Sequence, residues 1–230
     1  MAIISRPSPS LRDPGDPSIA GGSAVSPTRS KRRSHVIELL VLVLAALLGA
    51  LGTKTFVAQV FTVPSGSMLD TVVPGERLAV EKVSYLTHGP ARGDVIVFDG
   101  LGLFDDPTPG AHIFVKRVIG ISGDHVVCCD SVGRITVNDD PLDERRYVRA
   151  GDVPSTMKFN ISVPDGKLWL MGDHRSSSAD SRRYIGAPGG GFIPVDRVIG
   201  RAMAVVWPLA SARSIATRST FGRAGLGPDS

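Results

Sequence analysis

An apolar segment close to the N-terminus constrains this chain more than any other feature of its sequence. Residues 39–52 (LLVLVLAALLGALG) carry no charged side chain, and their flanks extend the apolar segment over residues 36–57. An α-helix rises about 1.5 Å per residue, so about 20 residues suffice to cross a hydrocarbon core of about 30 Å. We therefore predict a single transmembrane helix over residues 36–57. A cleavable signal peptide and a buried core helix remain as alternatives, although the stretch before the apolar run is unusually long for a signal peptide.

The charge of the chain is concentrated in the residues that precede this segment. Residues 1–35 contain six bases and two acids, which gives +4, the formal net charge of all 230 residues. They are also rich in Pro, Ser and Gly, so we predict a disordered tail, which the positive-inside rule places in the cytoplasm. The remaining residues balance 20 bases against 20 acids. That balance argues against a basic nucleic-acid-binding domain, and we predict no nucleic-acid partner.

The sequence that follows the apolar segment indicates a β domain outside the membrane. Short β-prone runs alternate with Gly, Pro and Asp, and no window of ten or more residues has helical periodicity. The strands predicted from alternation are Arg77–Val83, Asp94–Phe98, Arg134–Val137 and Lys158–Val163. A Pro-Asp-Gly turn at residues 164–166 predicts a hairpin with the following LWLM strand, and Val198–Trp207 is predicted to close the sheet. We expect a mainly β, antiparallel, barrel-like domain over residues 58–208 and a loose tail over residues 209–230.

Cysteine and histidine usage limits the metal and disulfide chemistry that is open to this chain. Its two cysteines, Cys128 and Cys129, are adjacent, and a bridge between neighbours closes a strained ring. A disulfide scaffold and a cysteine-based zinc site are therefore excluded, while the redox state of the pair stays open. The five histidines have no paired ligand spacing, so we predict neither a metal nor a cofactor.

Two short segments carry residues of the kind that nucleophilic catalysis needs. In PSGSM (64–68), Pro64 and Gly66 favour a tight turn that would present Ser67 just beyond a strand. In HIFVKRVI (112–119), Lys116 lies on a strand face between apolar neighbours. Burial there would lower the pKa of the lysine and leave a neutral amine, which a general base for a serine hydroxyl requires. The ordinary alternatives are a Ser-rich turn and an edge-strand lysine in water.

These segments, with three further blocks, resemble the bacterial type I signal peptidases, which are membrane-anchored peptidases of the Ser-Lys class in family S26. The resemblance spans about residues 36–208. The matching blocks, in chain order, are PSGSM (64–68), GERLAVEKVSY (75–85), RGDVIVF (92–98), FVKRVIGISGD (114–124) and GDHRSSSADSR (172–182). In the last block, His174, Ser176 and Ser177 replace the more usual Asn, Asp and Asn, while Ser178, Asp180 and Arg182 are retained.

The resemblance implies a role for each matching residue. Ser67 would be the nucleophile and Lys116 the general base, and Ser65 would complete an oxyanion hole with the Ser67 backbone N–H. Ser178 would orient the lysine amine. The residues that would support the site are Asp173, Asp180, Arg182 and Arg117. Those that would line shallow pockets for small substrate side chains are Phe61, Val63, Pro64, Met68, Val72, Phe114 and Val115.

The same resemblance implies a function. The chain would remove N-terminal signal peptides from exported preproteins after small residues of the Ala-x-Ala type, through an acyl-enzyme and without a cofactor. Its partners would be signal-peptide-bearing preproteins, membrane lipid and the secretion translocon, and it would cross the bacterial plasma membrane once. Two alternatives stay open. A self-cleaving Ser-Lys repressor-type protein would need a DNA-binding helix-turn-helix, which the sequence does not show, and a catalytically silent membrane-anchored β module would not need Ser67 or Lys116.

Overall fold

The computed structural model describes residues 35–46, 58–104, 112–215 and 221 of this chain. The chain divides into two units, residues 1–47 and residues 48–230. In the first unit, residues 35–46 form an exposed helix. No helix within the described residues is both long enough and apolar enough to cross a bilayer. The rest of the predicted transmembrane segment, residues 47–57, lies outside the described residues, as does nearly all of the predicted disordered tail.

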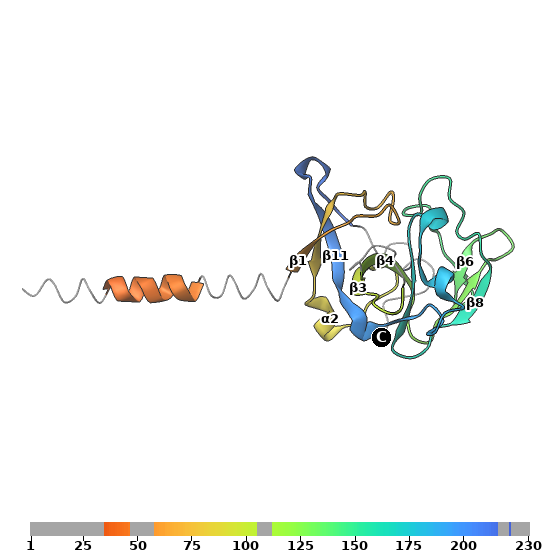
Figure 1. The fold of residues 1–230 in the computed structure, drawn as a ribbon, viewed down its shortest axis with the longest axis horizontal. Helices are drawn as coiled ribbons and strands as arrows, with labels where there is room; N and C mark the ends of the chain where they lie inside the picture. The colour runs from red at the N-terminus through yellow and green to blue at the C-terminus, as the bar shows by residue number, and fades with distance from the viewer. Residues whose placement is uncertain (1–34, 47–57, 105–111, 216–220, 222–230) are drawn as a thin grey trace, which may run out of the picture. The chain divides into compact units, whose positions relative to one another are not determined.

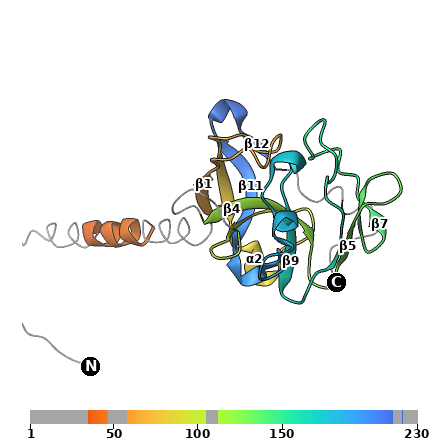
Figure 2. The same cartoon turned by 45° about the vertical axis from the view of Figure 1, so that its right-hand side comes forward.

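The described part of the second unit is built from two antiparallel β-sheets. The eight-stranded sheet has the order β1 (Ala58–Thr62), β2 (Arg77–Glu81), β11 (Val198–Trp207), β3 (Val95–Asp99), β4 (Ile113–Gly120), β9 (Lys167–Met171) and β10 (Ile193–Pro194), and β12 (Arg213–Ser214) pairs with β11. The four-stranded sheet has the order β7 (Asp140–Pro141), β6 (Ile135–Val137), β5 (His125–Cys128) and β8 (Phe159–Ser162). Figures 1 and 2 show the smaller sheet at the end of the domain away from β1 and β11.

Helical structure is scarce in the described part of this unit, as the sequence predicted. One four-residue α-helix, α2 (Ser84–Thr87), follows β2. The short 3-10 turns are η1 (Arg175–Ser177), η2 (Ser181–Tyr184), η3 (Val195–Arg197) and η4 (Leu209–Ser211). The prediction of a mainly β, antiparallel domain is confirmed. The barrel-like closure is not seen, because β1 and β10 end the path of the larger sheet among the described strands without pairing with each other.

The buried side chains explain why β3 and β4 form the centre of the domain. Alternation was expected in β3, but its first four residues are all buried, because apolar clusters cover both faces of the strand. In β4, exposure falls along the strand, and every residue from Lys116 to Gly120 is buried. The charged side chains of Lys116 and Arg117 therefore lie in the domain interior instead of pointing into water.

The predicted hairpin over residues 158–171 is not formed. The turn itself is present, because the Lys167 amide donates to the Pro164 carbonyl (3.1 Å) and Gly166 has a φ of 67°. However, β8 pairs with β5 in the smaller sheet, whereas β9 pairs with β4 and β10 in the larger one. A local turn signal fixes the reversal of the chain, but it does not determine which strands then pair.

The adjacent cysteines at the end of β5 are joined by a disulfide. The sequence had left their redox state open. The bridge connects neighbouring residues, so it closes a local ring and cross-links no two elements of the fold. Cys128 packs in the core beside the smaller sheet, together with Trp169 of the larger sheet.

Residues 209–215 pack against the domain, whereas their sequence predicts a loose tail. Beyond η4, β12 pairs with β11, and Ile215 is buried in the core. Arg213 makes two bonds to the Glu76 carboxylate (2.7 and 2.8 Å) and donates to the Thr71 carbonyl (2.8 Å). Phe221 is also buried and stacks with Tyr147. The polar composition of this stretch hid the few side chains that attach it to the domain.

Replacing Arg213 by alanine is expected to lower the thermal stability of the protein in a pH-dependent way. Hydrogen bonds from Arg213 hold the pKa of Glu76 below its ordinary value of 4.5. A lowered folded-state pKa stabilises the protein above pH 4.5, and this contribution is lost as the pH falls through the lowered value. The difference in Tm between wild type and Arg213→Ala should therefore be larger at about pH 7 than at about pH 3. Arg183→Ala, at an exposed arginine, is the control; an equal difference at both pH values would contradict the prediction.

Candidate active site

Ser67 and Lys116 lie within hydrogen-bonding distance of each other, although they are far apart in the sequence. Lys116 Nζ is 2.8 Å from Ser67 Oγ, and it also donates to the Val115 carbonyl (3.1 Å). The exposed fractions are 8% for Ser67 and 3% for Lys116. Because burial disfavours the charged ammonium, this environment suits an amine that takes a proton from a hydroxyl.

Ser67 is held in place by the loop that connects β1 to β2. The two ends of this loop are joined by two backbone hydrogen bonds. The Val63 amide donates to the Glu76 carbonyl (3.0 Å), and the Gly75 amide donates to the Val63 carbonyl (2.8 Å). Inside the loop, Met68 and Val72 are fully buried in the core below β2 and β3. Two apolar anchors therefore follow the nucleophile candidate within the same loop and fix its position.

The loop after β9 approaches Ser67 so closely that only glycine fits at position 172. A Cβ atom on Gly172 would lie 2.5 Å from the Ser67 carbonyl oxygen and 2.2 Å from Ser178 Oγ. The loop after β9 contacts Ser67 a second time, through a hydrogen bond from the His174 amide to the same Ser67 carbonyl (3.1 Å). The tertiary structure therefore brings Ser178 close to the backbone of Ser67, with Gly172 between them.

The Ser178 hydroxyl is buried, and it has no hydrogen-bond partner of ordinary geometry among the described residues. It nevertheless lies near enough to Asp180 to contribute to the low pKa of that carboxyl group. Burial alone would raise the pKa of Asp180, but the hydrogen bonds and charge of Arg182 hold it below its ordinary value of 3.8. Asp180 Oδ2 also accepts from the Gly172 amide (3.0 Å), which links this ion pair to the glycine that contacts Ser67.

Asp173 and Arg117 form a fully buried ion pair that joins the same loop to β4. Arg117 donates to both carboxylate oxygens (2.8 and 2.7 Å) and to the Gly93 carbonyl (2.8 Å), and both side chains are 0% exposed. Burial alone would lower the pKa of Arg117, but the charge of Asp173 raises it. The Thr71 hydroxyl donates to the same carboxylate. One carboxylate thus connects β4, the loop after β9 and the loop that carries Ser67.

A second buried ion pair, not predicted from the sequence, supports the loop after β9. Arg175 donates to both oxygens of Glu144 (3.0 and 2.6 Å) and to the Pro154 carbonyl (2.8 Å). The Tyr147 hydroxyl donates to the same carboxylate, and its ring lies 4.2 Å below the Arg117 guanidinium. Arg175 lies inside a matched block, but Glu144 and Tyr147 lie between the matched blocks, so the sequence carried no signal for them.

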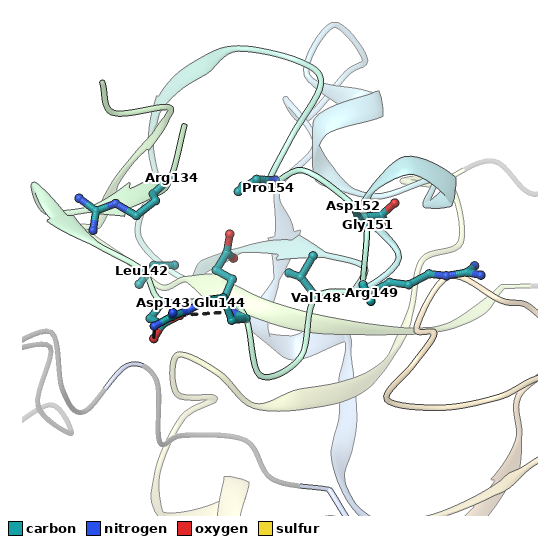
Figure 3. A pocket seen from close by; sticks show the side chains of 11 residues that line it. Arg134, Leu142, Asp143, Glu144, Val148, Arg149, Gly151, Asp152 and Pro154 are labelled. Atoms are coloured by element: carbon teal, nitrogen blue, oxygen red, sulfur yellow. Dashed lines mark hydrogen bonds and ion pairs between the residues drawn. The ribbon is translucent and has the colours of Figure 1, made fainter. Parts of the chain in front are cut away.

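A cavity of about 340 Å³ lies beside this ion pair, and neither Ser67 nor Lys116 lines it (Figure 3). Its lining residues come from residues 134–154, including Glu144, Arg149 and Asp152. In Figure 3 the Arg149 side chain leads away from the other lining residues. Within the described ranges, no three His, Cys, Asp or Glu side chains converge in a way that could hold a metal ion.

The remaining predicted site residues range from exposed to fully buried. Ser65 is exposed, and its Oγ lies 3.3 Å from Ser67 Oγ. Among the predicted pocket residues, Pro64 is exposed and Phe61, Phe114 and Val115 are half-buried, whereas Val63, Met68 and Val72 are buried. The Phe114 ring packs against the Phe98 and Phe104 rings, with centroids 5.7 Å apart in both pairs. The buried residues can shape a surface pocket only from below.

Comparison with known proteins shows which family this sequence matches. The family described as "Signal peptidase, peptidase S26" matches residues 36–207. A probable signal peptidase I of Mycobacterium leprae is 32% identical over 82% of this chain and 82% of its own length. A signal peptidase I of Leptolyngbya laminosa is 34% identical over 79% of this chain and 85% of its own length.

One solved structure, a signal peptidase I of Enterococcus faecalis, covers 50% of this chain and 97% of its own chain, with 25% identity. Its TM-score of 0.37 is too low to support an argument about the fold. The family match over residues 36–207 stands independently of it, and it covers the stretch on which the five sequence blocks were found. The chain belongs to the signal peptidase family, peptidase S26.

Proposed function

We propose that this protein removes signal peptides from exported preproteins, with Ser67 as the nucleophile and Lys116 as the general base. Membership of the peptidase S26 family and the names of its relatives support the reaction. The observation that carries the assignment of residues is the 2.8 Å separation of Ser67 Oγ and Lys116 Nζ at a buried position.

The proposed reaction has two steps, and the proton is accounted for in each. Neutral Lys116 takes the proton of Ser67 as Oγ attacks the carbonyl carbon of the scissile peptide bond. The Ser67 amide and the Ser65 hydroxyl donate to the oxyanion that forms. When the C–N bond breaks, the Lys116 ammonium returns its proton to the leaving amine and an acyl-enzyme remains. Lys116 then takes a proton from a water molecule as its oxygen attacks the ester carbonyl carbon. When the ester C–O bond breaks, the Lys116 ammonium returns that proton to Ser67 Oγ and the new carboxyl group is released. Ser178 would orient the amine in both steps.

The substrate is proposed to bind as an added strand. β1 is at the edge of the larger sheet within the described part of the chain, and β9 pairs with β4 only from Arg117 onward. An extended peptide could therefore bind beside residues 59–64 and 112–115 through main-chain hydrogen bonds. The half-buried side chains of Phe61, Phe114 and Val115 can contact that peptide directly. Since Met68 and Val72 fill the space beneath, the pockets would be shallow, which favours small residues such as those of an Ala-x-Ala site.

We also propose that residues 36–57 anchor the enzyme in the bacterial plasma membrane, with residues 1–35 cytoplasmic and the peptidase domain extracytoplasmic. Membrane lipid and the secretion translocon would then be partners, and no metal or nucleotide takes part in the proposed steps.

The test uses the full-length protein in phospholipid vesicles and a preprotein with an Ala-x-Ala site. We expect a single cut after the second Ala, and no cut when that Ala is replaced by Leu, because a shallow pocket cannot accept the longer side chain. Release of the mature protein with either substrate at equal rate would contradict the proposed specificity. Cleavage of the enzyme's own chain alone would favour a self-cleaving protein, and no product at all would favour a silent module.

The rate of cleavage is expected to rise with pH, because only the neutral form of Lys116 can accept the Ser67 proton. The measurement is kcat/KM for the preprotein from about pH 5 to about pH 9, at constant ionic strength. We expect an ascending limb that levels off once the amine is neutral. A flat profile over this range would argue against Lys116 as the base.

A further inference from the structure

His174 connects three parts of the domain around the nucleophile candidate, and it takes no part in the proposed catalytic steps. Its Nδ1 lies 3.1 Å from the Gly66 carbonyl oxygen, and its Nε2 lies 3.2 Å from Nη1 of Arg149. Its backbone amide donates to the Ser67 carbonyl (3.1 Å). The side chain is half-buried. One residue therefore contacts the peptide groups on both sides of Ser67.

The chemistry of these partners determines where the imidazole carries its proton. A carbonyl oxygen only accepts hydrogen bonds, so Nδ1 must be the donor to Gly66. A guanidinium group only donates, so Nε2 must accept from Arg149. Both bonds form together only in the neutral imidazole protonated on Nδ1. Arg149 is in turn held by its own amide, which donates to the Asp173 carbonyl (3.1 Å).

The charged groups around His174 are themselves engaged. Asp152, on the same segment as Arg149, accepts from the Ser176 hydroxyl (2.7 Å) and amide (3.2 Å). Burial would raise the pKa of Asp152, but these bonds from Ser176 hold it below its ordinary value. The chain neighbours of His174 are both in buried ion pairs, Asp173 with Arg117 and Arg175 with Glu144. Arg149 is thus the charged group whose contact fixes the tautomer.

The Gly66 carbonyl matters because it belongs to the same peptide group as the Ser67 amide. In a planar trans peptide the C=O and N–H bonds point in opposite directions, so fixing the oxygen also fixes the direction of the N–H. That N–H is the backbone donor of the proposed oxyanion hole. The bond from the His174 amide to the Ser67 carbonyl fixes the next peptide group in the same way.

We propose that His174 is a positioning residue for the oxyanion hole: its Nδ1–H holds the Gly66 carbonyl and thereby aims the Ser67 amide, and Arg149 enforces the tautomer that this requires. The inference rests on the proposed peptidase function. Because an oxyanion exists only along the reaction path, misdirecting its donor slows the chemical step and leaves substrate binding nearly unchanged.

The test compares kcat and KM of the full-length enzyme with those of three variants. His174→Ala is expected to lower kcat about 10- to 100-fold, less than the about 10²- to 10³-fold lost when an oxyanion donor itself is removed, and to change KM by less than about threefold. His174→Asn should restore most of kcat, because its amide nitrogen can donate to Gly66 from nearly the same place as Nδ1. His125→Ala removes a histidine hydrogen-bonded to Asn160 in the smaller sheet and is the matched control, with no change expected.

A spectroscopic measurement tests the geometry separately. In ¹⁵N-histidine spectra of the full-length protein near neutral pH, the signal that disappears in His174→Asn should have the shifts of a neutral imidazole protonated on Nδ1. The Nε2-protonated form, a His174→Ala enzyme with wild-type kcat, or equal loss in the Ala and Asn variants would overturn the inference. A wild-type enzyme that does not cleave would count against the proposed function instead, and the spectrum would still show whether the bond to Gly66 exists.

Discussion

Replacing Ser67 or Lys116 by alanine is expected to reduce kcat/KM for preprotein cleavage at least about 10⁴-fold, which is the scale of loss when a nucleophile or its base is removed. The physical reason is that neither group works alone. Without Lys116, Ser67 Oγ keeps its proton at neutral pH and is a weak nucleophile; without Ser67, no acyl-enzyme forms. The double variant should therefore be no worse than either single variant.

The controls separate loss of chemistry from loss of structure. Ser67→Ala removes one oxygen atom from a nearly buried site, so the circular dichroism spectrum and Tm should stay close to wild type. Lys158→Ala, at an exposed lysine next to β8, should keep full activity. Retention of more than about a tenth of the wild-type rate in Lys116→Ala would show that another group accepts the proton. Unfolding of Ser67→Ala would remove the basis for assigning it a purely chemical role.

Removing the carboxylate of Asp173 is expected to have the largest effect on stability. Asp173→Ala would leave the Arg117 guanidinium buried, with 0% exposed surface, next to a neutral side chain. Removing one partner of a buried pair typically costs about 3–5 kcal/mol, because the remaining charge has lost its compensation and its water. The loss should appear in the free energy of unfolding measured with urea.

The chain provides a matched control for this experiment. Arg145 and Asp143 form the same two-bonded arrangement (2.7 Å for both bonds), but they are exposed, so Asp143→Ala should change stability very little. If Asp173→Ala does not fold, the double variant Arg117→Met/Asp173→Leu keeps the prediction testable, because removing both charges should recover much of the loss. Equal effects of Asp173→Ala and Asp143→Ala would contradict the argument.

Local sequence patterns predicted the elements of the fold better than their pairing. The strands expected at residues 77–83, 94–98, 134–137 and 158–163 are all present, with bounds shifted by one or two residues, and β11 has the predicted bounds. Alternation and turn residues act over a few neighbours, so they suffice for this. The choice of sheet for β8 and β9 depends on contacts with distant strands, and the turn between them predicted it wrongly.

For the candidate site too, the sequence predicted the residue types, but it did not predict how they are arranged in space. The residue types at positions 67 and 116, together with the five ordered blocks, were enough to indicate a Ser-Lys peptidase. Spacing along the chain cannot supply the distances between these groups, which come from the fold. Ser67 and Lys116 are 2.8 Å apart, Gly172 lies against the Ser67 carbonyl, and Glu144 compensates the charge of Arg175.

The sequence by itself determined which chemistry this protein could perform and which segments would be strands, because residue type and short-range periodicity are local properties. Only the tertiary structure decided how the C-terminal segment packs through Arg213, how the two sheets divide the strands, and that His174 lies against the Ser67 loop. These features depend on burial and on hydrogen bonds between residues more than 100 positions apart. The direction and environment of such side chains are set by the packed domain as a whole.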